Sequence, residues 1–400
     1  MARADALARF SEGGPGVTRR FCTPEHRAAV ELIQGWMREA GMNAVLDASG
    51  NVVGRYEGAK PGLPALMMGS HQDTVRSGGR YDGMLGIIAP ISCVAALNRR
   101  GFRLPYAIEV IAFGDEEGLR FQTSLLGSKA IAGTFDFAAL QRKDPDGVTM
   151  EAAMRDFGLD PQKIPALARK KSDVLAFVEI HIEQGPVLES RGLPVGVVTA
   201  IASGTRLSVR LEGEAGHAGT VPMNQRRDAL NGAAECMLAV ERLAKTGPGL
   251  VGTVGQIAPE PGAINVIPGA VRFSVDARGP EPAPRDALVE AIAKEIRLIA
   301  SRRKLGVQID TTQASNGCVC TPWVMDQFDA AVRAEGIAPF RLFSGAGHDT
   351  MSMVKLTDVG MLFVRCERGI SHNPAEAIMP EDAGIGARVF LRFLESFKRH

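Results

Sequence analysis

The sequence lacks the features that would place it in a specialised class. Its 46 Lys and Arg face 45 Asp and Glu, so no overall field draws it to nucleic acid or to an acidic membrane. The six cysteines are scattered without a C-x-x-C pair, which indicates reduced, buried thiols. No apolar run approaches the ~20 residues of a membrane helix, and the first residues show no signal-peptide pattern. We therefore predict a cytoplasmic protein with neither a nucleic-acid nor a membrane partner.

The composition is that of a globular protein. The 400 residues are 45% hydrophobic and 23% charged, and this length suggests two domains. In the first part, helical patterns at 24–40 and 84–98 alternate with short apolar runs at 63–68, 108–113 and 174–180. Such alternation predicts an α/β fold with a mainly parallel sheet that is covered on both faces.

The pattern changes between residues 205 and 313. Strands and helices are expected there in the order β-α-β-β-α-β, at 206–212, 226–244, 250–257, 270–277, 284–302 and 306–310. This is the split-βαβ, ferredoxin-like order of a small α+β domain. A buried run at 359–364 and a helix at 381–398 follow. We predict a large α/β domain, residues 1–204 and 314–400, interrupted by this inserted α+β domain.

Polar residues follow each buried run of the first part. Gly69-Ser70-His71-Gln72-Asp73 comes after the first run, Asp115-Glu116-Glu117 after the second, and His181-Ile182-Glu183-Gln184 after the third. Ligands bind outside the carboxyl ends of parallel strands, so we expect these segments to meet at one edge of the sheet. Asp82 lies in a Gly-rich turn shortly after His71, and His372 follows the buried run at 359–364.

Imidazole and carboxylate groups together suit Zn²⁺, Mn²⁺, Ni²⁺ or Co²⁺. A carboxylate such as Asp82 can bridge two ions about 3.5–4 Å apart, as in two-metal hydrolases. In the pair Glu116-Glu117, one carboxylate can bind metal while the other acts as general acid and base.

Each motif also has an ordinary structural explanation. A single histidine usually makes structural hydrogen bonds, Glu116-Glu117 is typical of a helix start, and Asp82-Gly83 is typical of a turn. A plain α/β protein with structural histidines is therefore one alternative, and a metal-dependent binding protein without catalysis is another. The coincidence of such residues at several strand ends favours the metal site.

The inserted domain has candidates of its own. His217 follows a strand, Asn265 lies in a loop, and Arg278 ends a strand. Together they can clamp a carboxylate, or they can be surface residues, and the pattern leaves both possibilities open. The loop Ser344-Gly345-Ala346-Gly347 lacks the lysine of a phosphate loop, but its backbone N–H groups can hold an anion.

These segments resemble a known family. Gly69-Ser70-His71-x-Asp73, Gly78-Gly79-x-Tyr81-Asp82-Gly83, Phe113-x-Asp115-Glu116-Glu117 and His181-Ile182-Glu183-Gln184-Gly185 resemble the M20 metallopeptidase superfamily. The His-Ile-Glu-Gln-Gly segment resembles its hydantoinase/carbamoylase branch in particular, which includes N-carbamoyl-L-amino-acid hydrolases, β-ureidopropionases and allantoate amidohydrolases. The similarity extends through residues 371–376 and covers nearly the whole chain.

The resemblance implies a role for each matching residue. His71 and His181 would bind one divalent ion, Glu117 and His372 a second, and Asp82 would bridge the two. Glu116 would be the general acid and base, and Asp73 would orient His71. Gln184, Asn265, Arg278 and Gly345 would hold the substrate. In relatives the inserted domain forms a homodimer and closes over the site, so that His217 would reach the partner subunit's site and polarise the scissile carbonyl.

The activity implied is hydrolysis of the carbamoyl C–N bond of a small ureido acid, an N-carbamoyl amino acid or allantoate. A metal-bridging hydroxide would attack the carbamoyl carbon, and ammonia and carbon dioxide would leave. A dipeptidase or aminopeptidase on the same fold is the alternative within the superfamily. The branch's histidine at position 181 disfavours it, because ordinary M20 peptidases tend to carry an acid there.

Overall fold

The computed structural model describes residues 1–399 and divides the chain into two compact units. Unit 1 comprises Met1–Thr199, Cys320–Leu342 and the chain from His348 onward. Unit 2 comprises Ala200–Val319 and Phe343–Gly347.

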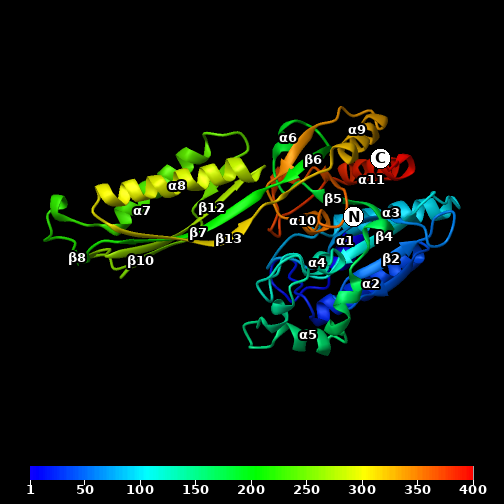
Figure 1. The fold of residues 1–400 in the computed structure, drawn as a ribbon, viewed down its shortest axis with the longest axis horizontal. Helices are drawn as coiled ribbons and strands as arrows, with labels where there is room; N and C mark the ends of the chain where they lie inside the picture. The colour runs from blue at the N-terminus through cyan, green and yellow to red at the C-terminus, as the bar shows by residue number, and fades with distance from the viewer. Residues whose placement is uncertain (400) are drawn as a thin grey trace. The chain divides into compact units, whose positions relative to one another are not determined.

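Unit 1 is built on a mixed β-sheet (Figure 1). Its strands run in the order β1 (Asn43–Leu46), β2 (Val52–Tyr56), β4 (Ala107–Phe113), β3 (Ala65–His71), β5 (Val174–Ile182), β16 (Val359–Val364) and β6 (Val195–Ile201). The four central strands, β4, β3, β5 and β16, are parallel, whereas the flanking strands pair antiparallel. The predicted parallel sheet is thus found at its centre, and the antiparallel β1–β2 pair was not predicted.

Apolar sequence accounts for the central strands. Every residue of β3, β4 and β16 is buried, as expected for strands covered on both faces. The helices of unit 1 are α1 (Ala2–Ala8), α2 (Pro24–Glu39), α3 (Leu85–Arg99), α4 (Leu126–Ile131), α5 (Met150–Asp156), α6 (Val187–Ser190), α9 (Pro322–Ala334), α10 (Thr350–Met353) and α11 (Pro380–Ser396). Short 3₁₀ helices of this unit are η1 (Phe137–Gln141), η2 (Pro161–Leu167), η3 (Lys171–Asp173) and η5 (Glu367–Gly369). The helices predicted at 24–40, 84–98 and 381–398 are confirmed to within two residues.

Unit 2 contains an antiparallel sheet with helices α7 (Ala229–Ala244) and α8 (Pro282–Arg302) on one face (Figure 1). The strand order is β10 (Ile257–Glu260), β12 (Ala270–Gly279), β7 (Ser203–Glu212) and β13 (Gly306–Ser315), and β9 (Val251–Thr253) also pairs with β12. Alternate residues such as Leu207, Val209 and Phe273 point into the core that the helices cover.

The elements of unit 2 follow the predicted order along the chain, with two differences. The run predicted as one strand at 250–257 is divided between β9 and β10, and a small extra sheet pairs β8 (Gly216–His217) with β11 (Val266–Ile267). Two further short strands of the chain are β14 (Cys318–Val319) and β15 (Arg341–Ser344).

Within residues 1–399, no helix has both the length and the apolar character needed to cross a membrane. The predicted cytoplasmic location stays a prediction. Cys22, Cys93, Cys236 and Cys366 are free thiols, and the last three are buried.

His26 shows what a structural histidine looks like in this fold. It lies in the first turn of α2, its Nδ1 accepts a hydrogen bond from the Cys22 N–H at 3.0 Å, and its ring stacks on Phe157. Complete burial lowers the pKa of His26 to about 3, and the nearby cations Arg19 and Arg27 act in the same direction. The ring is therefore neutral in the folded protein.

This burial predicts an acid-sensitive contribution to stability. The folded pKa lies below the unfolded value of 6.5, so the contribution is complete above pH 6.5 and is lost as the pH falls toward 3. Between pH 6 and 4, the free energy of unfolding of the wild type should fall more steeply than that of His26→Gln, by about 1.4 kcal/mol per pH unit. Chemical denaturation at several pH values measures this difference. Phe157→Leu, the control, should lose stability without a change of slope, and equal slopes for wild type and His26→Gln would contradict the assignment.

Candidate metal centre

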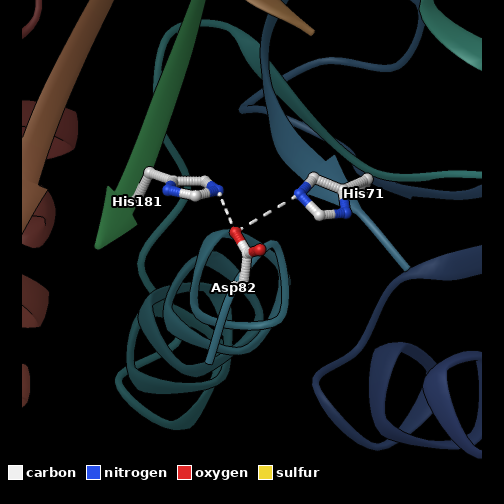
Figure 2. Close-up of side chains that lie close together, drawn as sticks. All are labelled: His71, Asp82 and His181. Atoms are coloured by element: carbon white, nitrogen blue, oxygen red, sulfur yellow. Dashed lines mark ion pairs between the residues drawn. The ribbon is translucent and has the colours of Figure 1, made fainter. Parts of the chain in front are cut away.

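The carboxyl ends of the central strands of unit 1 carry the predicted polar residues. His71 ends β3, His181 lies one residue before the end of β5, and Glu116 and Glu117 follow β4. Asp82 comes from the turn between β3 and α3. Figure 2 shows both imidazoles directed toward its carboxylate.

Three imidazoles converge on Asp82. His181 Nε2 and His71 Nε2 lie 3.3 and 3.8 Å from Asp82 Oδ1, and His372 Nε2 lies 3.2 Å from Asp82 Oδ2. His372 Nε2 is also 3.5 Å from Glu117 Oε1. Two groups suited to holding a metal ion result, His71–Asp82–His181 and Asp82–Glu117–His372, and they share Asp82.

Backbone carbonyls define which nitrogen of each imidazole is available. His71 Nδ1 lies 3.0 Å from the Asp73 carbonyl, and His181 Nδ1 lies 2.9 Å from the Ile182 carbonyl. A carbonyl only accepts, so Nδ1 carries a proton, and in the neutral ring that a metal ion requires, Nε2 would present its lone pair on the side of Asp82. The Gly83 N–H donates to His181 Nε2 at 3.2 Å, in agreement with this tautomer. Both histidines are therefore oriented as metal ligands are.

Asp73, which was predicted to orient His71, lies beside the imidazole with both its backbone carbonyl and its carboxylate, whose Oδ1 is 3.7 Å from His71 Nδ1. Its backbone carbonyl accepts a hydrogen bond from His71 Nδ1. Its carboxylate accepts hydrogen bonds from the N–H groups of Glu116 and Glu117 at 2.9 and 3.1 Å. The carboxylate thus fixes the segment after β4 relative to the end of β3.

The charges of the site are unbalanced. Burial opposes ionisation of Asp82, but a hydrogen bond from His372 and positive charge on His71, His181 and His372 in the metal-free protein hold its pKa well below its ordinary value. Burial raises the pKa of Glu117 to about 7, and burial together with the charge of Glu117 raises the pKa of Glu116 well above its ordinary range. Divalent cations are the groups that would supply the missing positive charge.

The spacing of the donor atoms also fits metal ions. Ligand atoms on a tetrahedral ion with bonds of ~2.0–2.1 Å lie roughly 3.3 Å apart. The contacts of 3.2–3.8 Å between the imidazole nitrogens and the Asp82 oxygens match this spacing. Within the described residues, Glu179, His181 and His348 form a further candidate group, and His71, Glu116 and Glu117 another.

Two predicted site residues adopt left-handed backbone conformations. His372 has φ 54° and Gln184 has φ 58°. Such conformations are unfavourable for residues with a β-carbon and are concentrated at functional sites. The Gln184 side chain donates to Asp82 Oδ1 at 3.0 Å and to Ser371 Oγ at 3.2 Å, so it joins the turn of Asp82 to the loop of His372.

Glu376 is a site residue that the sequence analysis missed. Its Oε1 accepts the N–H groups of Tyr81 and Asp82 at 2.8 and 3.0 Å, and its Oε2 accepts the Ser371 hydroxyl at 2.8 Å. Burial, with the charge of Asp82, raises the pKa of Glu376 to about 6. A β-carbon on Gly79 would lie 2.1 Å from Glu376 Cδ, so the Gly78-Gly79 pair before Asp82 was the available signal.

The remaining predicted residues lie in unit 2 and form two groups. His217 in β8 pairs with Val266 in β11, and the Ala218 N–H donates to the Asn265 carbonyl at 3.0 Å. Arg278 in β12 donates from Nε and Nη2 to the Asp276 carboxylate and from Nη1 to the Gly345 carbonyl at 2.8 Å.

Comparisons with known proteins identify the family of the chain. The model of peptidase family M20/M25/M40 matches residues 67–396. An N-carbamoyl-L-amino acid amidohydrolase of Geobacillus stearothermophilus is 42% identical over 94% of this chain and 91% of its own length. An allantoate deiminase of Arabidopsis thaliana is 39% identical over 99% of this chain and 81% of its own. The crystal structure of an amidase of the hydantoinase/carbamoylase family from Burkholderia multivorans is 32% identical, has a TM-score of 0.92, and covers 98% of this chain and 95% of its own.

The chain belongs to the M20 peptidase family, whose members use divalent metal ions. Within it, the chain falls in the hydantoinase/carbamoylase branch and is a hydrolase acting on carbon–nitrogen bonds other than peptide bonds.

Gly79→Ala tests the support that Glu376 gives to this site. The added methyl group would displace the Glu376 carboxylate from the N–H groups of Tyr81 and Asp82. Loss of such a partner of a ligand typically weakens metal binding by about 10- to 100-fold, which competition with a chelator measures. Gly35→Ala, in open space on α2, is the control and should leave the affinity unchanged while stabilising the helix by about 0.5–1 kcal/mol. Wild-type affinity in Gly79→Ala would show that Glu376 gives no such support.

Proposed function

We propose that this protein is a two-metal amidohydrolase that cleaves the carbamoyl C–N bond of a small ureido acid, an N-carbamoyl amino acid or allantoate. The observation that carries the proposal is the sharing of Asp82 between two ligand groups. His71 and His181 would hold one ion, Glu117 and His372 the other, and Asp82 both. The names of the relatives support the substrate class.

When bound, the two ions would activate water and polarise the carbamoyl carbonyl. Glu116 is the general base in this proposal. It follows β4 beside Glu117, it is buried, and its raised pKa suits a group that takes a proton and then returns it. Asp73 holds its backbone N–H, so Glu116 is fixed relative to His71. Glu116 would deliver the proton to the departing nitrogen, and the products would be the amine-bearing acid, ammonia and carbon dioxide.

Substrate binding is assigned to Gln184, Asn265, Arg278 and the Gly345 loop. Asp276 occupies one edge of the Arg278 guanidinium, and one N–H of Nη1 goes to the Gly345 carbonyl. Further N–H groups of Nη1 and Nη2 remain for a carboxylate, which guanidinium binds in bidentate fashion. The Asn265 side chain would bind the same carboxylate.

The inserted domain would serve for dimerisation and closure, and His217 would act in the partner subunit's site. Two features of His217 support this role. The side chain is exposed, and its Nδ1 accepts the Gly219 N–H at 3.0 Å. In the neutral ring Nε2 then carries the proton, and a proton on Nε2 can be donated to a developing oxyanion.

Glu116→Gln tests the assigned base. The amide cannot take a proton, so kcat should fall by about 10²–10⁴-fold or more while the bound metal per subunit stays at the wild-type value. Steady-state kinetics and metal analysis of the same preparations measure both quantities. Glu151→Gln, which removes a carboxylate from the surface of α5, should behave as wild type. A rate near wild type in Glu116→Gln would exclude this residue as the base.

Ammonia release tests the substrate class. Metal-reconstituted protein should release ammonia from allantoate, N-carbamoyl-β-alanine or an N-carbamoyl-L-α-amino acid, and a chelator should stop the reaction. Dipeptides serve as the comparison. Hydrolysis of dipeptides without release of ammonia from any ureido acid would contradict the proposal in favour of a peptidase.

A further inference from the structure

Arg19 is fully buried, and its side chain makes four hydrogen bonds to uncharged acceptors. Nε donates to the Gln72 carbonyl at 2.7 Å, and Nη2 donates to Met84 Sδ at 3.0 Å. Nη1 donates to the carbonyls of Leu7 and Phe10 at 2.9 and 3.1 Å. Arginine is almost never fully buried in a protein unless its guanidinium is paired with other groups.

Two of these acceptors lie next to the metal centre in sequence. Gln72 stands between His71 and Asp73, so its carbonyl belongs to the turn that ends β3. Met84 comes two residues after Asp82 and stands immediately before the first residue of α3. One planar guanidinium therefore contacts both turns that carry proposed ligands, from nitrogens that point in different directions.

The backbone on the N-terminal side of Arg19 also contacts the loop between His71 and Asp82. The Arg19 N–H donates to Thr74 Oγ1 at 2.9 Å, and the Thr74 N–H donates to the Arg19 carbonyl at 3.1 Å. Val17 and Gly78 exchange two backbone hydrogen bonds of 3.0 and 2.8 Å. The segment at 17–19 thus lies along the loop between His71 and Asp82 and holds it over much of its length.

We propose that Arg19 is a positioning residue of the metal centre, whose guanidinium fixes the turn of His71 and the turn of Asp82 relative to each other. This inference rests on the proposed function, because it takes both residues as metal ligands. Burial lowers the pKa of Arg19 to about 10, against the opposing charge of Asp73, so the guanidinium is protonated at neutral pH and all its donors are available.

Arg19→Lys separates positioning from charge. Lysine retains the positive charge, but its single nitrogen cannot contact both turns and the carbonyls of Leu7 and Phe10. The metal-free variant should fold, as circular dichroism would show. We expect metal affinity, measured by competition with a chelator, to weaken about 10- to 100-fold. The visible spectrum of the Co²⁺-loaded protein should also change, and kcat should fall more than KM rises.

Met84→Leu provides a milder test that preserves volume and charge. It removes only the thioether acceptor, so its metal affinity should weaken in the same direction by a smaller factor of roughly threefold, with a measurable change in the Co²⁺ spectrum. Arg20→Met is the matched control, because the neighbouring Arg20 pairs with Glu12 and contacts neither turn. Its metal affinity and Co²⁺ spectrum should equal those of the wild type.

The alternative is that Arg19 only anchors the C-terminal end of α1 and the residues after it, through the carbonyls of Leu7 and Phe10. In that case Arg19→Lys and Met84→Leu would lower the melting temperature of the metal-free protein, while metal affinity and Co²⁺ spectrum stayed at wild-type values, and the inference would be wrong. If Arg19→Lys does not fold, unchanged metal binding in Met84→Leu overturns the inference by itself. A wild type that binds no metal would overturn the proposed function as well, so the two failures are distinguishable.

Discussion

The side chain of Asp82 is almost completely removed from water, and a buried carboxylate must be compensated by positive charge or by hydrogen bonds. Three imidazoles surround it at 3.2–3.8 Å, Gln184 donates to its Oδ1, and its Oδ2 lies 3.2 Å from His372 Nε2. Burial, together with neighbouring carboxylates, raises the pKa values of Glu116 and Glu117, so these buried acids also need compensating positive charge. This deficit is the constraint that divalent ions would satisfy, and the surrounding structure serves to hold the ligands at the spacing that ions require.

The ligands come from three strand ends and two loops, and separate contacts hold each of them. Backbone carbonyls fix the tautomers of His71 and His181. The Asp73 carboxylate ties the segment after β4 to the end of β3, and Glu376 ties the loop of His372 to the turn of Asp82. Arg19 joins the two turns that flank the centre from the side of α1. Groups that bind no metal themselves therefore define the positions of the side chains that would bind it.

Much of the fold of unit 1 and of the metal centre could be predicted from the sequence. Apolar runs that end in histidine or acid identify both the central strands and the edge of the sheet where the polar residues gather. His71, Asp82, Glu117, His181 and His372 are brought together as expected. The β1–β2 pair was missed because its short strands, four and five residues long, give little periodicity. Glu376 and Arg19 act on groups of residues far away in sequence, and the Asp73 carboxylate accepts the N–H groups of Glu116 and Glu117 as well as lying beside His71. Apart from the Gly78-Gly79 pair against which Glu376 packs, no local pattern encodes such contacts, since they depend on how distant turns come together.

The central claim is that two metal ions share Asp82. Anomalous diffraction from crystals of the Co²⁺- or Mn²⁺-loaded protein tests it most directly. The account predicts two peaks about 3.5–4 Å apart on either side of the Asp82 carboxylate, one beside His71 and His181 and the other beside Glu117 and His372. A single peak, or a peak between Glu179, His181 and His348 with none beside Glu117 and His372, would contradict it.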